Sequence, residues 1–129
     1  MAVGFAPATA NAILNALCRN VAWTQPSAVW VKLHIGDPGA AATANPAVET
    51  DRIQGTFGSA ASGGAISNTA ALTWTSVAGA EDYTHFSAWD ASTSGNFLFS
   101  GTVGANAVMV GDDFVIPIGD LDVTLAVAA

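Results

Sequence analysis

Apolar and polar residues alternate most clearly along residues 29–35. Positions 29, 31, 33 and 35 hold valine, leucine or isoleucine, and Trp30, Lys32 and His34 lie between them. Because successive side chains of a strand point to opposite faces, this period predicts a strand with one buried face. The sequence Gly36-Asp-Pro-Gly39 follows directly. Its proline has a fixed φ and its glycines tolerate a positive φ, so it predicts a tight turn at the end of the strand.

Short alternating segments recur through the rest of the chain, and turn-forming residues separate them at close intervals. The expected strands cover residues 53–57, 65–68, 71–75, 83–89, 96–102, 108–110, 114–118 and 121–127. Closely spaced short strands are typical of an antiparallel sandwich or barrel. Pro117 cannot donate to a ladder, so we expect it at an edge or a bulge. In the segment 83–89, strict alternation places on one face Tyr83, His85, Ser87 and Trp89.

One helical pattern precedes these strands. Thr9 is the expected N-cap of a helix over residues 9–21, and the apolar face of this helix holds Ile13, Leu14, Leu17 and Val21. A helix of this length is marginal in water by itself, so its apolar face must be covered. We expect it to dock on the sheet of its own subunit, with a neighbouring subunit as the alternative. A charge at Leu17 is then expected to destabilise the fold.

These elements predict a mainly β fold, namely an antiparallel β-sandwich or barrel-like domain with one short N-terminal α-helix. We expect a single domain over residues 1–129, consisting of an N-terminal arm at 1–8, the helix at 9–21 and the β-sandwich at 29–127. A chain of 129 residues and 12.9 kDa is long enough to bury one sizeable core.

Residues 40–50 are rich in alanine, contain Asn45-Pro46 and show neither period, which predicts a long loop. Loops of this length are commonly functional or ordered by a partner, so we expect this one to contact other subunits and to tolerate replacement in the isolated domain. Large aromatic side chains are the usual anchors of such contacts. The candidate assembly contacts are therefore Phe5, Trp23, Trp30, Ala41, Thr43, Asn45 and Pro46.

The composition indicates a surface with few charged side chains. Hydrophobic residues make up 51% of the chain and charged residues only 10%, whereas about 25% charge is usual in a soluble domain. Such a surface suits burial against partners, although alanine also raises the hydrophobic count without forming large apolar patches. The net charge is −7, and the positive residues are Arg19, Lys32 and Arg52. These form no basic stripe, which excludes direct nucleic-acid binding.

The sequence contains no pattern typical of a membrane span, a metal site or a catalytic site. It has neither an apolar run of about 18 residues nor a secretory signal, so we expect no membrane association and a protein that stays in the cytoplasm where it is made. Cys18 fits a packing position. His34 and His85 have no third ligand at metal-binding spacing, and no nucleophile elbow or nucleotide motif occurs.

Four carboxylates lie within residues 112–122, at Asp112, Asp113, Asp120 and Asp122. Oxygen ligands of this kind suit calcium, but the spacing matches no calcium-binding loop, and aspartates are ordinary at turns and strand ends. We therefore expect no metal, no cofactor and no catalytic residue in this chain.

An ordered series of short motifs runs along most of the chain: Leu33-His-Ile-Gly-Asp-Pro-Gly39, Gly64-Ala-Ile-Ser-Asn68, Leu72-Thr-Trp74, Tyr83-Thr-His85 and Trp89-Asp90. With the alanine-rich helix before it, this series resembles small virion proteins of tailed phages that infect actinobacteria. Such proteins are variously labelled head-decoration, minor tail or tail-fibre proteins. Relatives often have threonine where this chain has Ile35, a difference that a strand position accommodates.

The resemblance implies a non-enzymatic virion structural protein, made in the host bacterial cytoplasm and located in the virion. We favour a decoration protein that binds the outside of the capsid and stabilises the assembled shell. The alternatives are a minor tail or tail-fibre component, and a carbohydrate-binding β-sandwich in which Trp30 and Trp89 stack on host sugars. The expected partners are the major capsid protein or tail proteins of the same phage and further copies of this chain, without nucleic acid, membrane or cofactor.

Overall fold

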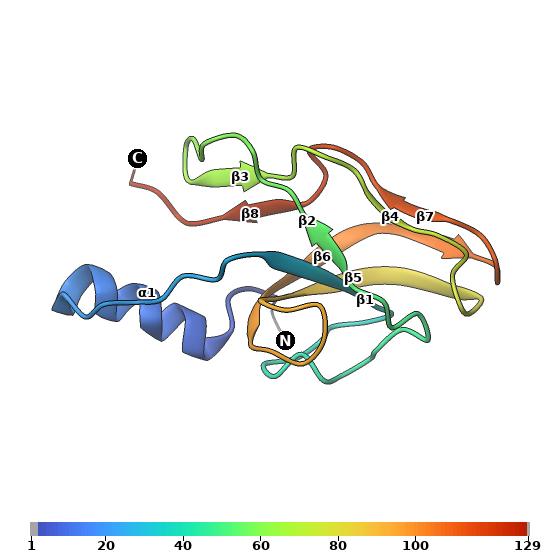
Figure 1. The fold of residues 1–129 in the computed structure, drawn as a ribbon, viewed down its shortest axis with the longest axis horizontal. Coiled ribbons are helices and arrows are strands. Elements are labelled where there is room, and N and C mark those ends of the chain that lie inside the picture. Colours follow the sequence, from blue (N-terminus) through green and yellow to red (C-terminus); the bar gives the residue numbers. More distant parts are fainter. Residues whose placement is uncertain (1–2, 129) are drawn as a thin grey trace.

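The fold is mainly β, as the sequence predicts. A computed structural model describes residues 3–128 (Figure 1). It contains one helix, α1 (Pro7–Arg19), and the strands β1 (Val29–His34), β2 (Ile53–Gly55), β3 (Ala65–Ser67), β4 (Leu72–Trp74), β5 (Glu81–Trp89), β6 (Phe97–Val108), β7 (Phe114–Ile116) and β8 (Asp122–Thr124). All recorded strand pairs are antiparallel. The predicted antiparallel, sandwich-like architecture with one short helix is therefore confirmed.

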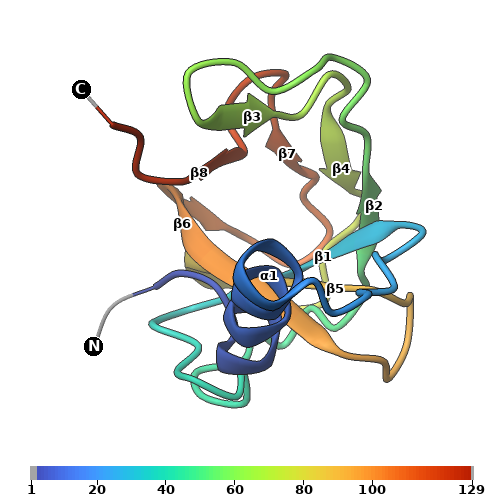
Figure 2. The same cartoon turned by 90° about the vertical axis from the view of Figure 1, so that its left-hand side faces the viewer.

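The strands form two layers. One layer is a four-stranded sheet in the order β2-β1-β5-β6, and the other consists of the two-stranded ribbons β3-β8 and β4-β7. Figures 1 and 2 show both ribbons on the same side of the large sheet. The alternation that predicts β1 is confirmed at Val31 and Leu33, which are fully buried between the layers, but it is wrong at Ile35, which follows the end of β1 and is 47% exposed. The opposite face of the large sheet carries Trp30, Lys32 and His34.

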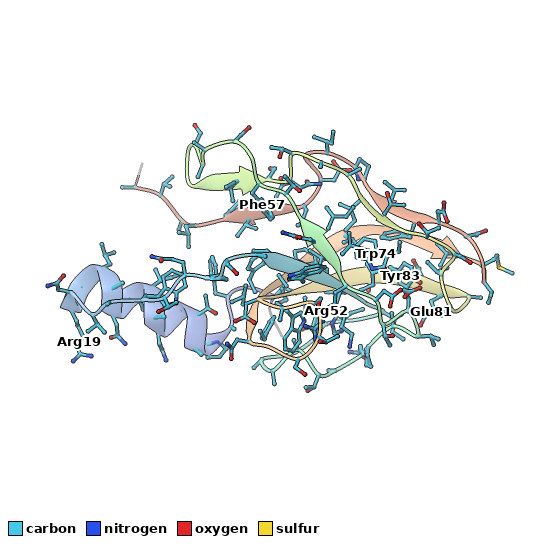
Figure 3. All side chains as sticks on the ribbon, in the orientation of Figure 1. Arg19, Arg52, Phe57, Trp74, Glu81 and Tyr83 are labelled. Atoms are coloured by element: carbon cyan, nitrogen blue, oxygen red, sulfur yellow. The ribbon has the colours of Figure 1, made fainter. Side chains whose placement is uncertain are left out.

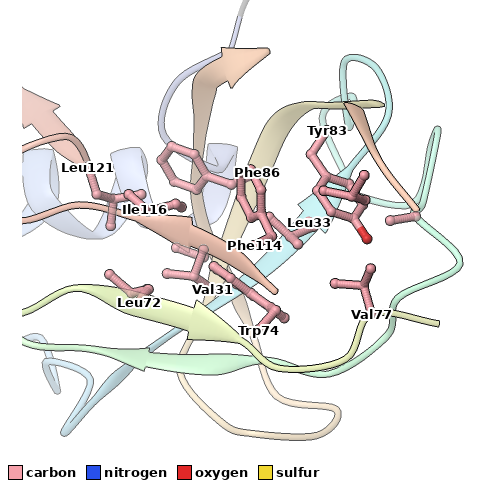
Figure 4. Close-up of a cluster of buried hydrophobic side chains, with 13 residues drawn as sticks. Val31, Leu33, Leu72, Trp74, Val77, Tyr83, Phe86, Phe114, Ile116 and Leu121 are labelled. Carbon is pink, nitrogen blue, oxygen red and sulfur yellow. The ribbon is translucent and has the colours of Figure 1, made fainter. Parts of the chain in front are cut away.

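Large apolar side chains from both layers fill the core (Figure 4). Phe114 of β7 lies between two aromatic neighbours, with ring centroids 5.9 Å from Trp74 and 4.9 Å from Tyr83. The buried cluster comprises Val31, Leu33, Ala47, Leu72, Trp74, Val77, Tyr83, Phe86, Ala88, Val108, Phe114, Ile116 and Leu121. Burial of this apolar surface is the main force that holds the two layers together.

Two details of the strands differ from the predictions. A register shift between Tyr83 and His85 turns Tyr83 into the core, so strict alternation along β5 is wrong at that residue. At this irregularity β6 advances four residues, from Thr102 to Asn106, while β5 advances two, from His85 to Tyr83. In addition, β6 continues unbroken from Phe97 to Val108, where the sequence predicts two separate strands.

The last strand is shorter than predicted. β8 covers Asp122–Thr124 instead of residues 121–127, because its partner β3 is only three residues long. Leu125 and Val127 lie beyond the ladder and are exposed. Pro117 follows the end of β7 and takes no place in a ladder.

The helix departs most from expectation. It begins at Pro7, a residue suited to the first helical turn, and ends at Arg19, before a left-handed Asn20. Thr9 does not cap it; its hydroxyl lies 3.4 Å from the carbonyl oxygen of Phe97. None of its residues is buried, and α1 projects from one end of the sheets (Figures 1 and 2). Of the predicted apolar face, Leu14, Leu17 and Val21 are exposed and Ile13 is half-buried, so docking of that face within the subunit is wrong for all but Ile13.

The chain itself covers the other side of the helix. After α1, residues 20–28 run back beside it towards β1 (Figure 1). A groove of about 510 Å³ lies between the two segments and the β5–β6 turn, and its lining includes Ala12, Trp23 and Phe97. We call α1 together with residues 20–28 the helix arm. Its inner side faces this groove, which leaves the stripe of Leu14, Leu17 and Val21 outside.

Candidate functional site

A directed chain of hydrogen bonds lies on the outer face of the large sheet, around His34. The indole N–H of Trp89 donates to the hydroxyl of Ser87 over 2.8 Å, and Ser87 lies 2.8 Å from Nε2 of His34. Nδ1 of His34 lies 2.9 Å from the carbonyl oxygen of Ala44 and must donate to it. In the neutral ring with its proton on Nδ1, Nε2 is the acceptor for the Ser87 hydroxyl.

This network orders the loop that follows β1. The amide of Ile35 donates to the carbonyl of Asn45, and the amide of Ala47 donates to the carbonyl of Leu33. Inside the loop, the side chain of Asn45 donates to the carbonyl of Asp37. Ala42 and Ala47 are buried. The loop is therefore built into the fold by its own subunit, which contradicts the expectation that it tolerates free replacement.

The stability of the protein should fall below neutral pH because the folded chain binds a proton at His34 less readily than the unfolded chain does. Burial lowers the pKa of His34, the bond to the Ala44 carbonyl opposes that shift, and the charge of Lys32 adds to it. Below about pH 6.5, which is the ordinary pKa of histidine, the unfolded chain binds a proton at this residue that the folded chain binds only at lower pH. The free energy of unfolding therefore keeps its full value above that pH. It declines as the pH falls further, by at most about 1.4 kcal/mol per pH unit.

The check is urea unfolding of the wild type and of His34→Gln between about pH 7.5 and about pH 5.5. Glutamine is able to donate to Ala44 and accept from Ser87, but it does not titrate in this range. The wild type should lose stability relative to the variant. Asp90 does not interfere, because hydrogen bonds from Asn96 lower the pKa of its carboxyl group and confine its effect to more acidic solution. Parallel pH profiles for the two proteins would contradict the prediction.

The His34–Ser87 pair is not placed for catalysis. Both residues are fully buried, so a substrate has no access to the Ser87 hydroxyl. The predicted carboxylate cluster is also separated: Asp112 accepts from the amide of Met109 at one turn, whereas Asp122 bonds the hydroxyl of Ser67 at β3. Among residues 3–128, no three His, Cys, Asp or Glu side chains gather as a metal site requires.

The tryptophans of the outer face lie side by side. Trp30 of β1 and Trp89 of β5 are partners across the ladder. The guanidinium carbon of Arg52 lies 4.3 Å from the centre of the Trp89 ring, and Arg52 also donates to the carbonyls of Ala91 and Ser94. This cation–π contact covers one face of the indole. That face is then not free to stack on a sugar.

The other predicted contact residues fall into two groups. Phe5 is half-buried, pairs with Phe99 at the edge of β6 and packs edge-on against its ring, and Trp23 is half-buried in the groove of the helix arm. Phe5 therefore packs the segment before α1 against β6, and Trp23 lines the groove beside α1. Ala41, Thr43, Asn45 and Pro46 are exposed on the ordered loop. The structure does not bring the seven residues together into one surface.

The exposed side of the helix arm is a surface that sequence reasoning did not recognise as free. Leu14, Leu17 and Val21 have exposed fractions of 56%, 79% and 44%. Their spacing of three and four residues places them on one side of the helix and its extension. Cys18 is also exposed, so the packing position predicted for it is wrong, and Arg19 ends the helix. Apolar side chains gathered on a projecting helix are typical of interaction surfaces.

A second exposed apolar surface lies at the opposite end of the molecule. Val48, Met109 and Val110 are between 60% and 68% exposed. The surrounding acidic side chains come from the start of β5 and from the β6–β7 turn, which lie far from α1 (Figures 1 and 3). We call this surface the acidic end and define it as Val48, Glu81, Asp82 and residues 109–113.

Direct contacts connect the parts of the acidic end. The carboxylate of Glu81 accepts from the amide of Val48 over 2.7 Å. Glu81 pairs with Val108 in the ladder, one residue before Met109. Asp82 is exposed and pairs with Ala107. No single stretch of sequence contains this surface, and the signal that pointed towards it was the clustering of Asp112 and Asp113.

Comparison with known proteins identifies a family. A family model described as Podophage GP4 fiber I protein gp80 matches residues 4–124, a stretch that includes α1 and every strand of the fold. No curated protein matches the chain. The match confirms the expected resemblance to phage virion proteins, whereas the actinobacterial host group stays a prediction. Within residues 3–128, no helix has the length and apolar character needed to span a membrane.

Proposed function

This chain belongs to the family of the podophage GP4 fiber I protein gp80, and from that membership we propose that it is a non-enzymatic structural subunit of a phage fibre. The observation that supports an assembly role is the exposed apolar stripe of the helix arm, which the subunit itself leaves uncovered. Burial of such a stripe against a neighbour removes apolar surface from water and stabilises the assembled state. The proposed neighbours are fibre or tail proteins of the same phage and further copies of this chain.

A capsid decoration role stays a prediction and is the alternative to the fibre role. We favour the fibre because the description of the family names a fibre protein. The exposed part of the ordered loop, from Ala41 to Pro46, is proposed as a secondary contact. Antibody labelling of purified particles, imaged by electron microscopy, tests the position directly. Label on fibres supports the proposal, label over the whole shell supports decoration, and particles without the protein contradict both.

We predict that Leu17→Asp leaves the fold intact and reduces incorporation into particles. The side chain of Leu17 is 79% exposed, so the free energy of unfolding should change by less than about 0.5 kcal/mol. A buried charge in the assembled contact would instead cost enough to lower occupancy at least about tenfold. The measurements are thermal unfolding of the isolated protein and quantitative mass spectrometry of particles produced with each variant.

Ser59→Asp is the matched control, because it adds the same charge on an exposed loop outside the helix arm. It should leave both stability and occupancy unchanged. Equal occupancy for the two variants would show that the stripe on the helix arm is not an assembly contact. A large loss of stability for Leu17→Asp would instead mean that the helix docks on the body of its own subunit.

A further inference from the structure

We infer that copies of this chain join head to tail, with the helix arm of one copy docked on the acidic end of the next. This inference rests on the proposed fibre role and specifies the contact that builds the fibre. The two surfaces lie at opposite ends of the long axis, as the labels of Arg19 and Glu81 in Figure 3 show. One contact therefore leaves a free surface at each end of the pair, and each free surface is able to receive a further copy.

The two surfaces match in apolar character. The helix arm offers Leu14, Leu17 and Val21, and the acidic end offers an exposed valine, methionine and valine at positions 48, 109 and 110. Each set gathers at one end of the molecule instead of lying scattered over its surface. Met109 has an unbranched, adaptable side chain that packs against helices of varied shape. Docking would bury both sets at once.

The two surfaces also match in charge. Arg19 ends the helix and is exposed, whereas Arg52 is held by the carbonyls of the β5–β6 turn and by Trp89. The acidic end carries Glu81 and Asp82, together with the two aspartates of the β6–β7 turn. Head-to-tail docking brings Arg19 to these carboxylates. A helix-to-helix pair would bring two arginines together, and a pair of acidic ends would repel, so charge selects one orientation.

The symmetry of such a contact determines the assembly. Two different surfaces of the same subunit form a heterologous interface, which repeats as a ring when the rotation closes and as a filament when it does not. Residues 3–128 form no fibrous repeat or long helix. A fibre made from this fold therefore requires stacking of compact units, which a heterologous end-to-end contact provides.

The first test is sedimentation velocity of the full chain over a wide range of protein concentration. The inference expects a series of species that lengthens with concentration, and a weaker association at high ionic strength because salt screens the contact between Arg19 and the carboxylates. A chain that stays strictly monomeric up to millimolar concentration would overturn the inference. A dimer that adds no further subunits would also overturn it, because a closed pair is an isologous contact.

A charge exchange tests the pairing. Arg19→Glu and Asp82→Lys should each raise the dissociation constant at least about tenfold, and the double variant should recover most of the loss because the two charges have changed places. Asp82 suits this test because it is exposed and none of the hydrogen bonds recorded within residues 3–128 involves its carboxylate. Asp120→Lys is the control: it makes the same charge change at an exposed turn away from both ends and should leave association unchanged. A double variant as weak as the single variants would overturn the pairing.

The native Cys18 gives an independent readout. Its thiol is exposed beside Leu17 and Arg19, so a thiol-bound photocrosslinker on it should label the segments 46–52 and 107–113 of a second copy. Mild oxidation should give no Cys18–Cys18 disulfide, because the two thiols of neighbouring copies lie a full subunit apart. Disulfide-linked dimers, or crosslinks confined to the helix arm, would overturn the inference.

Failure of this inference and failure of the proposed function are distinguishable. If the protein is present in purified particles but monomeric at every concentration in solution, the head-to-tail contact is wrong and the structural role stands. If the protein self-associates as expected but is missing from particles, the structural role is wrong. Particle composition and solution association therefore test separate statements.

Discussion

Replacing Asn68 with alanine is expected to lower the free energy of unfolding by about 3 kcal/mol, which is a large part of the stability of a domain of this size. Asn68 is only 1% exposed. Its side-chain nitrogen donates to the carbonyls of Ala70 and Pro117, and its side-chain oxygen accepts from the amides of Gly119 and Leu121. All the hydrogen-bonding capacity of the amide group is therefore used.

The position of Asn68 explains the size of the effect. The side chain connects the segment between β3 and β4 with the turn between β7 and β8, so one residue joins the two ribbons of the second layer. Alanine would leave the buried amide of Leu121 without its partner and would remove the bonds to the carbonyls of Ala70 and Pro117, whereas the amide of Gly119 keeps its bond to the backbone carbonyl of residue 68. An unsatisfied buried group costs more than the bond itself contributes.

The measurement is equilibrium unfolding in urea, followed by tryptophan fluorescence. Asn11→Ala is the matched control, since Asn11 is exposed on α1 and alanine is the better helix former. That variant should be as stable as the wild type or slightly more stable. Should Asn68→Ala prove no less stable than Asn11→Ala, water must replace the four bonds, and the two ribbons are not joined through this side chain.

The sequence predicts β1 well because local pattern and tertiary environment agree there. The strand has neighbours on both sides, and one of its faces lies against the core, so Val31 and Leu33 follow the period. The same period fails at Tyr83, which is buried beside an irregularity of the β5–β6 ladder. Bulges arise from the pairing of two strands, and the alternation of one strand alone contains no record of them.

The helix shows a second limit of sequence patterns. Its apolar stripe predicts correctly that Leu14 and Leu17 share a face, but a pattern of this kind does not specify what covers the face. The structure leaves it open because residues 20–28 occupy the other side of the arm. An exposed stripe is therefore information about assembly that becomes visible only when the position of the helix is known.

For the loop after β1, the sequence pattern predicts less order than the structure shows. Its alanine-rich sequence has no period, which predicts an irregular loop that a partner orders on contact. The bonds that order it come from residues distant in sequence, because His34 binds the carbonyl of Ala44 and Glu81 binds the amide of Val48. The acidic end is equally invisible in sequence, since it joins three separated segments. Long-range contacts of this kind order the loop and bring the three segments of the acidic end together.

Gly101→Ala is expected to destabilise the fold by about 2 to 3 kcal/mol, although the change adds a single methyl group. Gly101 of β6 is the ladder partner of Phe86 on β5. A Cβ atom at this position would lie 2.6 Å from Cε1 and 2.8 Å from Cζ of the Phe86 ring. Phe86 is buried and packs edge-on against Phe99, with centroids 6.1 Å apart. The ring therefore has no space to move without disturbing the core.

Gly104→Ala is the control on the same strand. A Cβ atom there meets no other atom within 4 Å, and alanine reduces the conformational freedom of the unfolded chain. That variant should be as stable as the wild type or slightly more stable in thermal and urea unfolding. The difference between the two variants isolates the contact with Phe86 from the general cost of losing a glycine in a strand. If both variants unfold at the same urea concentration, the Phe86 ring must have another rotamer available, and the core around it is less tightly packed than the structure indicates.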